Sequence, residues 1–384
     1  MKKILIELRD SLYFLCSIQF WRMGVLWTSS IIYSYLQLWL NKVMFRKCKS
    51  YPRCSLKLSP SAAKRPVCVV TGATSGLGAA AALSLSKEGY YVVLAGRNAQ
   101  NLSEAVKEIK QRQPDAHLKT FQVDLTSFES ILKFKSSLQQ WLLDSDMHTS
   151  IQLLVNNAGI LATSRRFTAE GYDQMITTNY IAAFSVTNLL LPLLKNSCAP
   201  SRIVNVTSFT HRCVSGIDVC RKGLTGNDSL ASKRYPCAQV YEYTKYLTAT
   251  YKLSTVCLLM FSYQLHRQFC LDGHSPQVSV IAADPGVVET NLMREVPSHL
   301  SFLAIRILKF LGLLQSPDNG VEAIIDASLA PPEVSGEYFF GGNGRVTNSS
   351  SLSYDTKLAE RLWTTSSNLF LELQLSYKNP AEKA

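Results

Sequence analysis

One tyrosine and one lysine in the second half of the chain have a spacing that could carry proton-transfer chemistry. In Tyr241-Glu242-Tyr243-Thr244-Lys245 the first tyrosine and the lysine are four residues apart, so on a helix they share one face. A phenol has a pKa of about 10 and is a poor acid–base catalyst at neutral pH. A cation one helical turn away favours the phenolate and lowers that pKa. We therefore predict that Tyr241 transfers the proton in a reaction at a carbonyl or alcohol oxygen, with Lys245 tuning it.

A glycine-rich segment near residue 75 could hold a cofactor that contains phosphate. It follows an apolar stretch, precedes an Ala-rich stretch, and reads Thr71-Gly72-Ala73-Thr74-Ser75-Gly76-Leu77-Gly78. In a strand–turn–helix unit Gly72 allows the tight turn, Gly76 lets the backbone approach a pyrophosphate, and Gly78 lets the helix pack on the strand. The free N–H groups at the helix N-terminus would face the anion. We predict a dinucleotide site formed by Gly72, Thr74, Ser75, Gly76, Leu77 and Gly78.

The elements that must position these residues alternate along the chain. Short runs rich in Val, Ile and Leu are typical of strands buried on both faces, and they cover residues 67–71, 91–95, 118–123, 151–155, 202–207, 277–283 and 336–340. Helical periodicity covers residues 77–88, 102–113, 127–143 and 241–269. Such alternation implies right-handed crossovers. We predict an α/β fold, a doubly wound Rossmann-type parallel sheet with helices on both faces.

The glycine spacing, G-x-x-x-G-x-G, resembles the short-chain dehydrogenase/reductase superfamily. Further family elements follow in the family's order, and they are Asn156-Asn157-Ala158-Gly159, Thr178-Asn179-Tyr180, a serine at the end of a strand (Ser208), the Tyr241–Lys245 pair, Asp284-Pro285-Gly286-Val287 and Thr290. The stretches at 315–320, 336–340, 354–358 and 362–363 look like the retinol-dehydrogenase-like branch. The resemblance therefore implies an NAD(P)-dependent oxidoreductase acting on CH–OH groups.

The resemblance also implies roles for particular residues. Ser208 would hydrogen-bond the carbonyl oxygen and stabilise developing charge. Asn179 would support a water-linked proton relay with Lys245. The expected catalytic set is thus Ser208, Tyr241, Lys245 and Asn179. The remaining cofactor contacts would come from Asp124 at the adenine, from Asn157, Ala158 and Gly159 after the fourth strand, from Pro285, Gly286, Val287 and Thr290 beside the nicotinamide, and from Tyr241 and Lys245 themselves.

The end of the second strand bears on the choice of cofactor. An NAD site would place an acidic residue there, on the ribose diol. This chain has Gly96-Arg97 instead, and an arginine suits the 2′-phosphate of NADP. We expect NADP, with NAD as the alternative. No metal site is predicted, because the ten cysteines include no C-x-x-C pair and no histidine spacing completes a zinc set.

The N-terminal region differs from the rest in charge and hydropathy. Residues 1–65 hold twelve of the Lys and Arg residues and two acidic ones, so most of the net charge of +12 lies there and a nucleic-acid partner is disfavoured. Residues 23–40 carry no charge and would form a helix of about 27 Å, enough for a bilayer core. The alternative is a helix that lies in the plane of the membrane surface, because Ser29 and Ser30 lower the hydropathy of the segment. A cleavable signal peptide is disfavoured by the basic flank that follows.

Four segments follow from this division. They are a membrane anchor at 1–45, a basic linker at 46–65 whose cations would meet anionic lipid headgroups, a catalytic domain at 66–345 and a C-terminal helical extension at 346–384. We expect a membrane protein, single-pass or monotopic, in the endoplasmic reticulum with its catalytic domain facing the cytosol. Homodimerisation stays open.

Two segments bear on the substrate. Residues 211–240 lengthen the usual interval before Tyr241 and form either a lid or a surface excursion. Residues 300–314 form either an amphipathic core helix or a lid that reaches the bilayer interface. With a membrane tether, we expect a lipophilic alcohol, ketone or aldehyde, such as a retinoid, steroid or polyprenoid. The alternative function is a catalytically silent, nucleotide-binding membrane scaffold or regulatory protein.

Overall fold

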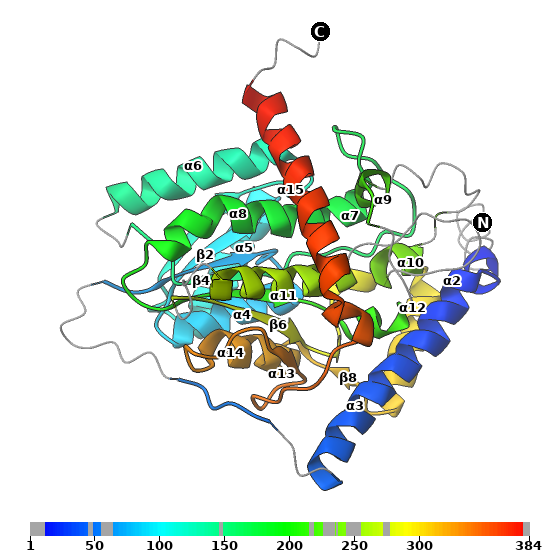
Figure 1. Ribbon diagram of the computed structural model, residues 1–384. Helices are drawn as coiled ribbons and strands as arrows, with labels where there is room; N and C mark the ends of the chain where they lie inside the picture. Colours follow the sequence, from blue (N-terminus) through cyan, green and yellow to red (C-terminus); the bar gives the residue numbers. More distant parts are fainter. Residues whose placement is uncertain are drawn as a thin grey trace.

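A seven-stranded parallel sheet forms the centre of the molecule (Figure 1). The computed structural model describes residues 12–44, 49–54, 64–145, 149–214, 219–225, 235, 237–242, 255–271 and 277–378. The strand order is β3-β2-β1-β4-β5-β6-β9. The strands are β1 (Val67–Thr71), β2 (Tyr91–Gly96), β3 (Leu118–Gln122), β4 (Leu153–Asn156), β5 (Ser201–Val206), β6 (Val278–Asp284) and β9 (Tyr338–Phe340). The predicted fold class is confirmed, and the order reverses between β1 and β4, where such sheets bind ligands.

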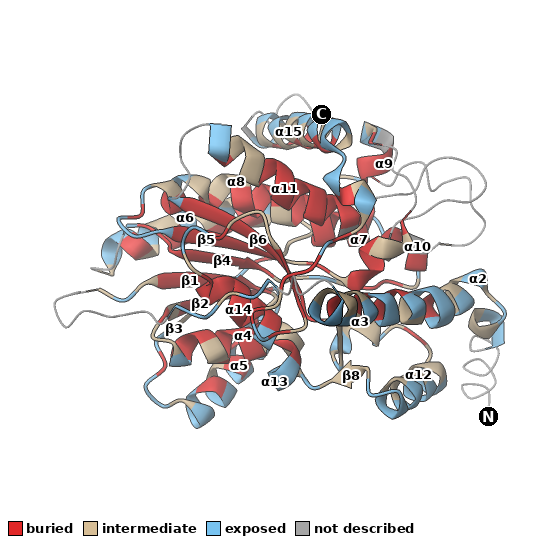
Figure 2. Cartoon of the chain, turned by 60° about the horizontal axis from the view of Figure 1, so that its bottom comes forward, coloured by how far each residue is buried: buried red, intermediate tan, exposed pale blue. Residues whose placement is uncertain are grey.

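Helices cover both faces of the sheet, which explains why the strands are apolar throughout. One layer contains α4 (Gly76–Lys87), α5 (Ala99–Arg112) and α14 (Glu322–Leu329), and the other contains α6 (Phe128–Asp144), α8 (Ala182–Lys195) and α11 (Thr255–Leu271). Figure 2 shows the sheet between these two layers, with α15 (Thr356–Lys378) lying outside α8 and α11. All five residues of β1 and all seven of β6 are buried.

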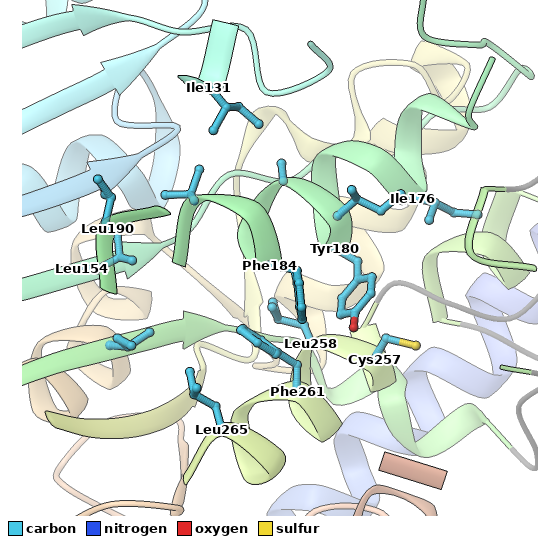
Figure 3. Packing of buried hydrophobic residues seen from close by; sticks show 14 of the residues in the cluster. Ile131, Leu154, Ile176, Tyr180, Phe184, Leu190, Cys257, Leu258, Phe261 and Leu265 are labelled. Atoms are coloured by element: carbon cyan, nitrogen blue, oxygen red, sulfur yellow. The ribbon is translucent and has the colours of Figure 1, made fainter. Parts of the chain in front are cut away.

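The larger core lies between α8, α11 and α15. The rings of Tyr180, Phe184 and Phe261 converge there (Figure 3), with Phe184 and Phe261 centroids 5.1 Å apart. Trp363 of α15 stacks on Phe261 at 5.9 Å and 16°. Our sequence analysis assigned no helix to Gln174–Lys195, yet this helix is the one in the described part of the chain long and apolar enough to cross a membrane. Since 67% of its most apolar stretch is buried, it serves as a core helix.

The predicted N-terminal helix forms, and it lies along the α/β domain (Figures 1 and 2). It comprises α2 (Ile18–Trp21), a π-helical turn η1 (Arg22–Trp27) and α3 (Thr28–Val43). Its inner face is buried through Ser30, Ile31, Ser34 and Leu38. Ser30 Oγ donates a hydrogen bond to the carbonyl of Phe209, 2.7 Å away. The segment predicted as an anchor is therefore also an integral part of the fold.

The described part of the predicted basic linker also contacts the domain. Lys49 pairs with Glu337, and Arg53 pairs with Glu322 and, at 2.6 Å, with Asp326. Two cations that we assigned to lipid headgroups are thus neutralised by carboxylates of the domain itself.

Two further parts differ from the predicted element pattern. The helix predicted at 241–269 is described as α10 (Cys237–Glu242) and α11, and residues 243–254 between them lie outside the described residues. The helix predicted within 300–314 is α12 (Ser298–Phe310), flanked by a two-residue strand pair that the sequence did not indicate, β7 (Val287–Val288) with β8 (Leu314–Gln315). The boundaries of the four predicted segments stay predictions.

Candidate active site

The glycine-rich loop lies between β1 and α4, at the carboxyl edge of the sheet. Gly72 and Gly76 have φ angles of +66° and +52°, which side chains disfavour. A Cβ atom at Gly72 would lie 2.9 Å from Ala158 Cα, and one at Gly78 would lie 2.2 Å from the Gly72 oxygen. The loop can therefore form this close turn only with glycine at these places.

The N-terminus of α4 is suited to an anion. Its N-cap, Ser75, makes no capping hydrogen bond with its side chain, and the first turn holds no acidic residue. First-turn N–H groups without a capping partner are available to a phosphate oxygen. A Cβ at Gly76 would lie 3.1 Å from the Thr290 methyl carbon, so the Thr290 segment faces the loop. These residues fit the pyrophosphate of a nicotinamide dinucleotide.

The segment after β4 is fastened to the glycine loop. Asn157 Nδ2 donates to the Thr71 carbonyl at 3.0 Å. The N–H groups of Asn157 and Ala158 both donate to Thr71 Oγ1, at 3.0 and 3.1 Å. Gly159 comes next and lies beside Asn179. A Cβ atom added at Gly159 would lie 3.6 Å from Asn179 Oδ1. The predicted cofactor residues from two separate strands thus form one continuous rim.

Asn179 lies in a π-helical turn, η2 (Thr177–Ile181), an irregularity often found at functional sites. Its Oδ1 accepts from the Ile160 N–H at 2.8 Å, and its Nδ2 donates to the Ile160 carbonyl at 2.9 Å. The side-chain amide is therefore engaged in holding the loop after β4. Lys245, its predicted relay partner, lies outside the described residues.

Ser208 and Tyr241 come together from different elements. Ser208 follows β5 and caps the short helix η3 (Phe209–Cys213), and its Oγ accepts from Thr210 Oγ1 at 3.2 Å. Tyr241, in α10, is hydrogen-bonded to the Ser208 side chain. Burial raises the pKa of Tyr241 to about 12, the Ser208 hydrogen bond lowers it, and the negative charge of Asp284 raises it further. We predict that the Lys245 cation lowers the pKa of Tyr241, and this remains a prediction.

Asp284 is a buried carboxyl group of this site that our sequence analysis gave no role. It ends β6 and accepts from the Gly286 N–H at 2.8 Å and from the Tyr338 hydroxyl at 2.5 Å. Burial raises the pKa of Asp284 to about 6, although both hydrogen bonds and the Arg212 charge lower it. An acidic residue ending an apolar strand, directly before Pro285, was the signal in the sequence.

His211 lies beneath the serine. Its Nδ1 is 2.8 Å from the Ser208 carbonyl oxygen, and its ring packs edge-on against Tyr338 with centroids 5.2 Å apart. Burial, followed by the Arg212 charge, lowers the pKa of His211 to about 3. This ring is therefore neutral at physiological pH.

The N-terminal helix forms a wall of the site. The Trp27 ring lies against the Tyr241 ring, with centroids 5.4 Å apart. A Cβ atom at Gly286 would lie 3.6 Å from the Tyr35 hydroxyl and 3.8 Å from Ile31 Cδ1. The sequence analysis missed this wall because it treated the helix as an anchor. The serines within its apolar run were the available signal.

A glutamine links this wall to the turn after β6. Gln315 Nε2 donates to the Tyr35 hydroxyl at 3.3 Å and to the Pro285 carbonyl at 3.2 Å. Val287, predicted beside the nicotinamide, pairs with Leu314 in β7 and β8. The turn that carries Pro285 and Gly286 is thus held between the N-terminal helix and the segment after α12.

Two predicted cofactor residues lie on the other side of the loop. Arg97 follows β2 and is exposed, and its carbonyl accepts from Gln122 Nε2 at 3.1 Å. Thr74 lies close to Gly96, the residue before Arg97. A Cβ atom added at Gly96 would lie 2.7 Å from the Thr74 methyl carbon. Asp124 follows β3, and its Oδ1 accepts from the Thr126 N–H and hydroxyl at 2.9 and 2.7 Å. A dinucleotide across the loop would thus extend from Arg97 and Asp124 towards Tyr241.

Known proteins resemble this chain in sequence and fold. The family model for short chain dehydrogenases matches residues 66–215. Human polyprenol dehydrogenase is 31% identical over 319 residues, which cover 80% of this chain and 87% of that protein. Human retinol dehydrogenase 13 is 31% identical over 307 residues, covering 78% of this chain and 83% of that protein. A crystal structure of an uncharacterized Mycobacterium paratuberculosis protein has a TM-score of 0.58 at 25% identity, covering 80% of this chain and 94% of that one.

The similarity to these relatives extends well beyond the glycine loop, over most of both chains. It confirms the family predicted from the motifs. The chain therefore belongs to the short-chain dehydrogenase/reductase family, in its retinol-dehydrogenase-like branch, and is an oxidoreductase of CH–OH groups that uses a nicotinamide dinucleotide.

Proposed function

We propose that this chain is a membrane-associated, NADP(H)-dependent enzyme that interconverts a lipophilic alcohol with its ketone or aldehyde. The observation that supports this most is the hydrogen-bonded pair of Ser208 and Tyr241. The pair lies at the carboxyl edge of the sheet, which also carries the glycine loop of the cofactor site. A proton-transfer group, a hydroxyl donor and a dinucleotide site are the components that carbonyl reduction requires.

Each of these residues has a definite part in the proposed reaction. A bound nicotinamide dinucleotide would supply or accept the hydride. Tyr241 holds the proton that the carbonyl oxygen receives, and the Ser208 hydroxyl orients that oxygen. Because burial raises the pKa of Tyr241 to about 12, the protonated phenol is the resting form. We propose that the Lys245 cation counteracts this shift and lets Tyr241 also accept a proton in alcohol oxidation.

The choice of NADP is supported by Arg97. Its side chain is exposed at the end of β2, and it makes no ion pair with any side chain in the described ranges. A guanidinium without a carboxylate partner can bind a 2′-phosphate through two hydrogen bonds. An NAD site would favour a carboxylate at this place.

The lipophilic nature of the substrate is supported by the wall beside Tyr241. Trp27 contacts the Tyr241 ring, and Ile31 and Tyr35 of the same helix lie beside Gly286, so the side of the helix that meets the site is aromatic and aliphatic. The two relatives described above are named as dehydrogenases of polyprenol and of retinol, both long apolar alcohols. We extend this substrate class, with steroids as a further member, to this chain. We also propose placement at the endoplasmic reticulum membrane with the domain facing the cytosol.

Isotope transfer into a lipid extract tests the proposal. Microsomes that contain the chain would be incubated with a lipid extract and with NADPH deuterated at its transferable position. Mass spectrometry should detect deuterium in a lipid alcohol, and microsomes with the Tyr241→Phe variant should show none above background. If the wild-type chain binds NADPH but labels no lipid, the silent scaffold becomes the better account.

A further inference from the structure

Two helices that are far apart in the sequence expose apolar side chains at the same end of the molecule. In α2, η1 and α3 exposed apolar residues recur at spacings of three, four or seven positions and therefore share one outer face, formed by Ile18, Trp21, Val25, Ile32, Leu36, Trp39 and Val43. In α12 and its C-cap the exposed set is Phe302, Leu303, Ile307, Phe310 and Leu311, with Phe310 90% exposed. Figures 1 and 2 both show α12 beside α3. We call these two faces together the outer apolar surface.

The two helices are also held together by contacts. Leu313, which follows α12, packs into the same hydrophobic cluster as Ile31 and Leu38 of α3. The Gln315 bond to the Tyr35 hydroxyl joins the same two segments. The segment after α12 thus fixes the position of α12 relative to α3, and the two exposed faces belong to one region of the fold. Exposed apolar patches of this kind mark sites of interaction with a membrane or a partner.

The inner face of the N-terminal helix is already occupied by polar contacts with the domain. Arg212 donates through Nε to Ser34 Oγ at 2.9 Å and through Nη2 to Gln37 Oε1 at 3.1 Å. Ser30 bonds the Phe209 carbonyl, next to Ser208. If this helix crossed a bilayer, these contacts would draw the end of β5 and its backbone polar groups into hydrocarbon, where they have no water. The contacts therefore favour a helix that lies flat.

The charges around the outer apolar surface select its partner. Residues 12–44 and 296–317 contain no acidic residue. Their cations are Arg22 and Lys42 in the first segment and Arg306 and Lys309 in the second. Arg306 lies over the Phe302 ring at 4.7 Å, so charge and apolar surface are adjacent. A second copy of this chain would place cations against cations, whereas anionic lipid headgroups complement them.

We propose that the outer apolar surface docks on an anionic bilayer and that the N-terminal helix lies in the plane of that bilayer without crossing it. The same helix contacts Tyr241 on its inner side. A lipophilic substrate therefore reaches Tyr241 from the bilayer side, a consequence that rests on the proposed function. Docking itself does not depend on turnover.

Vesicle flotation tests the docking surface. The purified full-length chain would be mixed with phosphatidylcholine vesicles, with and without phosphatidylserine. We expect phosphatidylserine to increase binding. The double variant Ile32→Glu/Leu36→Glu and the variant Phe310→Glu should each bind about tenfold less, because a charge replaces apolar burial. Leu143→Glu, at a 63% exposed leucine of α6, is the matched control and should bind like the wild type.

The proposal is overturned if the variants bind as well as the control or if phosphatidylserine has no effect. A change in oligomeric state of the variants, with vesicle binding intact, would also overturn it and assign the surface to contacts between copies.

Two native cysteines distinguish a flat helix from a spanning one. Cys16 precedes α2 and Cys54 follows α3, within the linker, and both are exposed. A membrane-impermeant maleimide would be added to the vesicle-bound chain, and the modified peptides would be mapped by mass spectrometry. Modification of both cysteines from the same side is expected. Modification of only one of the two, with the other modified after detergent opens the vesicles, would show a spanning helix and refute the proposal.

Turnover of a water-soluble carbonyl in detergent separates this proposal from the proposed function. Ile32→Glu/Leu36→Glu should keep that turnover while losing vesicle binding. Tyr241→Phe should lose turnover and keep vesicle binding. Failure of docking and failure of catalysis therefore give different results.

Discussion

The indole ring of Trp27 lies against the phenol ring of Tyr241, with ring centroids 5.4 Å apart. This contact joins the N-terminal helix to the residue that we propose transfers the proton. A segment with the composition of an anchor thus contributes directly to the site. Removing it to solubilise the protein would remove one wall of the active site along with the surface that we propose docks on the membrane.

Replacement of Trp27 tests that relationship. Trp27→Ala removes an aromatic contact that contributes about 1 kcal/mol beyond its buried area and loosens the position of Tyr241. We expect kcat/KM for a lipophilic substrate in detergent to fall about tenfold, with the Kd for NADPH unchanged. Trp39→Ala, at a 56% exposed position on the outer face of the same helix, is the control. Equal kinetics for the two variants would refute the role of Trp27.

The buried carboxyl of Asp284 should make stability depend on pH. Its pKa is raised from 3.8 to about 6 in the folded chain, so the folded state holds its proton more strongly than the unfolded state. Relative to Asp284→Asn, the wild type should be most stable below pH 4 and should lose up to about 3 kcal/mol as the pH rises through 6. Denaturant unfolding of both proteins from pH 4 to 7 measures this.

Asp115→Asn, at an exposed position, controls for a general effect of removing one carboxylate. A pH-independent difference between wild type and Asp284→Asn would show that the burial of Asp284 is wrong. Since the Asp284 charge raises the pKa of Tyr241, which accepts the proton in alcohol oxidation, the limb on which oxidation rises with pH should also move to lower pH in Asp284→Asn.

Cofactor selectivity should depend on Arg97. We expect Arg97→Ala to weaken NADPH binding by about 10- to 100-fold, because a charge-assisted hydrogen-bond pair to the 2′-phosphate is lost. NADH binding should stay the same, since NADH lacks that phosphate. Fluorescence titration with both cofactors gives the ratio, and Lys107→Ala is an exposed control on α5. Equal losses for both cofactors would argue against 2′-phosphate recognition.

The glycine loop should not tolerate a methyl group at its third glycine. A Cβ at Gly78 would lie 2.2 Å from the Gly72 oxygen and 2.5 Å from Asn157 Nδ2, so the backbone must move. Gly78→Ala should lose about 1–3 kcal/mol of stability and its NADPH binding. Gly24→Ala has no heavy atom within 4 Å of the new Cβ and should retain both. Thermal unfolding and cofactor titration that show no difference between the variants would contradict the loop geometry.

The sheet was predictable because its strands are buried on both faces and carry uninterrupted apolar runs. β1 was placed correctly at Val67–Thr71, and β4 was placed two residues early at its start. The helix over Gln174–Lys195 was missed, because its polar first half is held by tertiary contacts. The Tyr180 hydroxyl lies 2.8 Å from Ser366 Oγ, and Asn179 Oδ1 accepts from the Ile160 N–H at 2.8 Å, contacts that no local pattern indicates.

The candidate site also contains residues that the sequence could place and residues that it could not. The glycine loop and the Ser208 and Tyr241 positions follow from local spacing, so the sequence could place them. The wall formed by Trp27, Ile31 and Tyr35 was not predicted, because the N-terminal helix carries apolar residues on both faces and only serines such as Ser30 and Ser34 mark the face that meets the domain. The raised pKa of Asp284 could also be recognised only from the structure, because it results from burial of the carboxyl group.

The most direct test of the catalytic account is Tyr241→Phe, assayed with a lipophilic alcohol or carbonyl beside a cofactor-binding titration. The variant removes one hydroxyl and keeps the ring that Trp27 contacts. We predict that kcat falls by at least about 100-fold, the contribution of a positioned proton donor, while the Kd for NADPH stays within about twofold. Turnover at the wild-type rate in this variant would contradict the account.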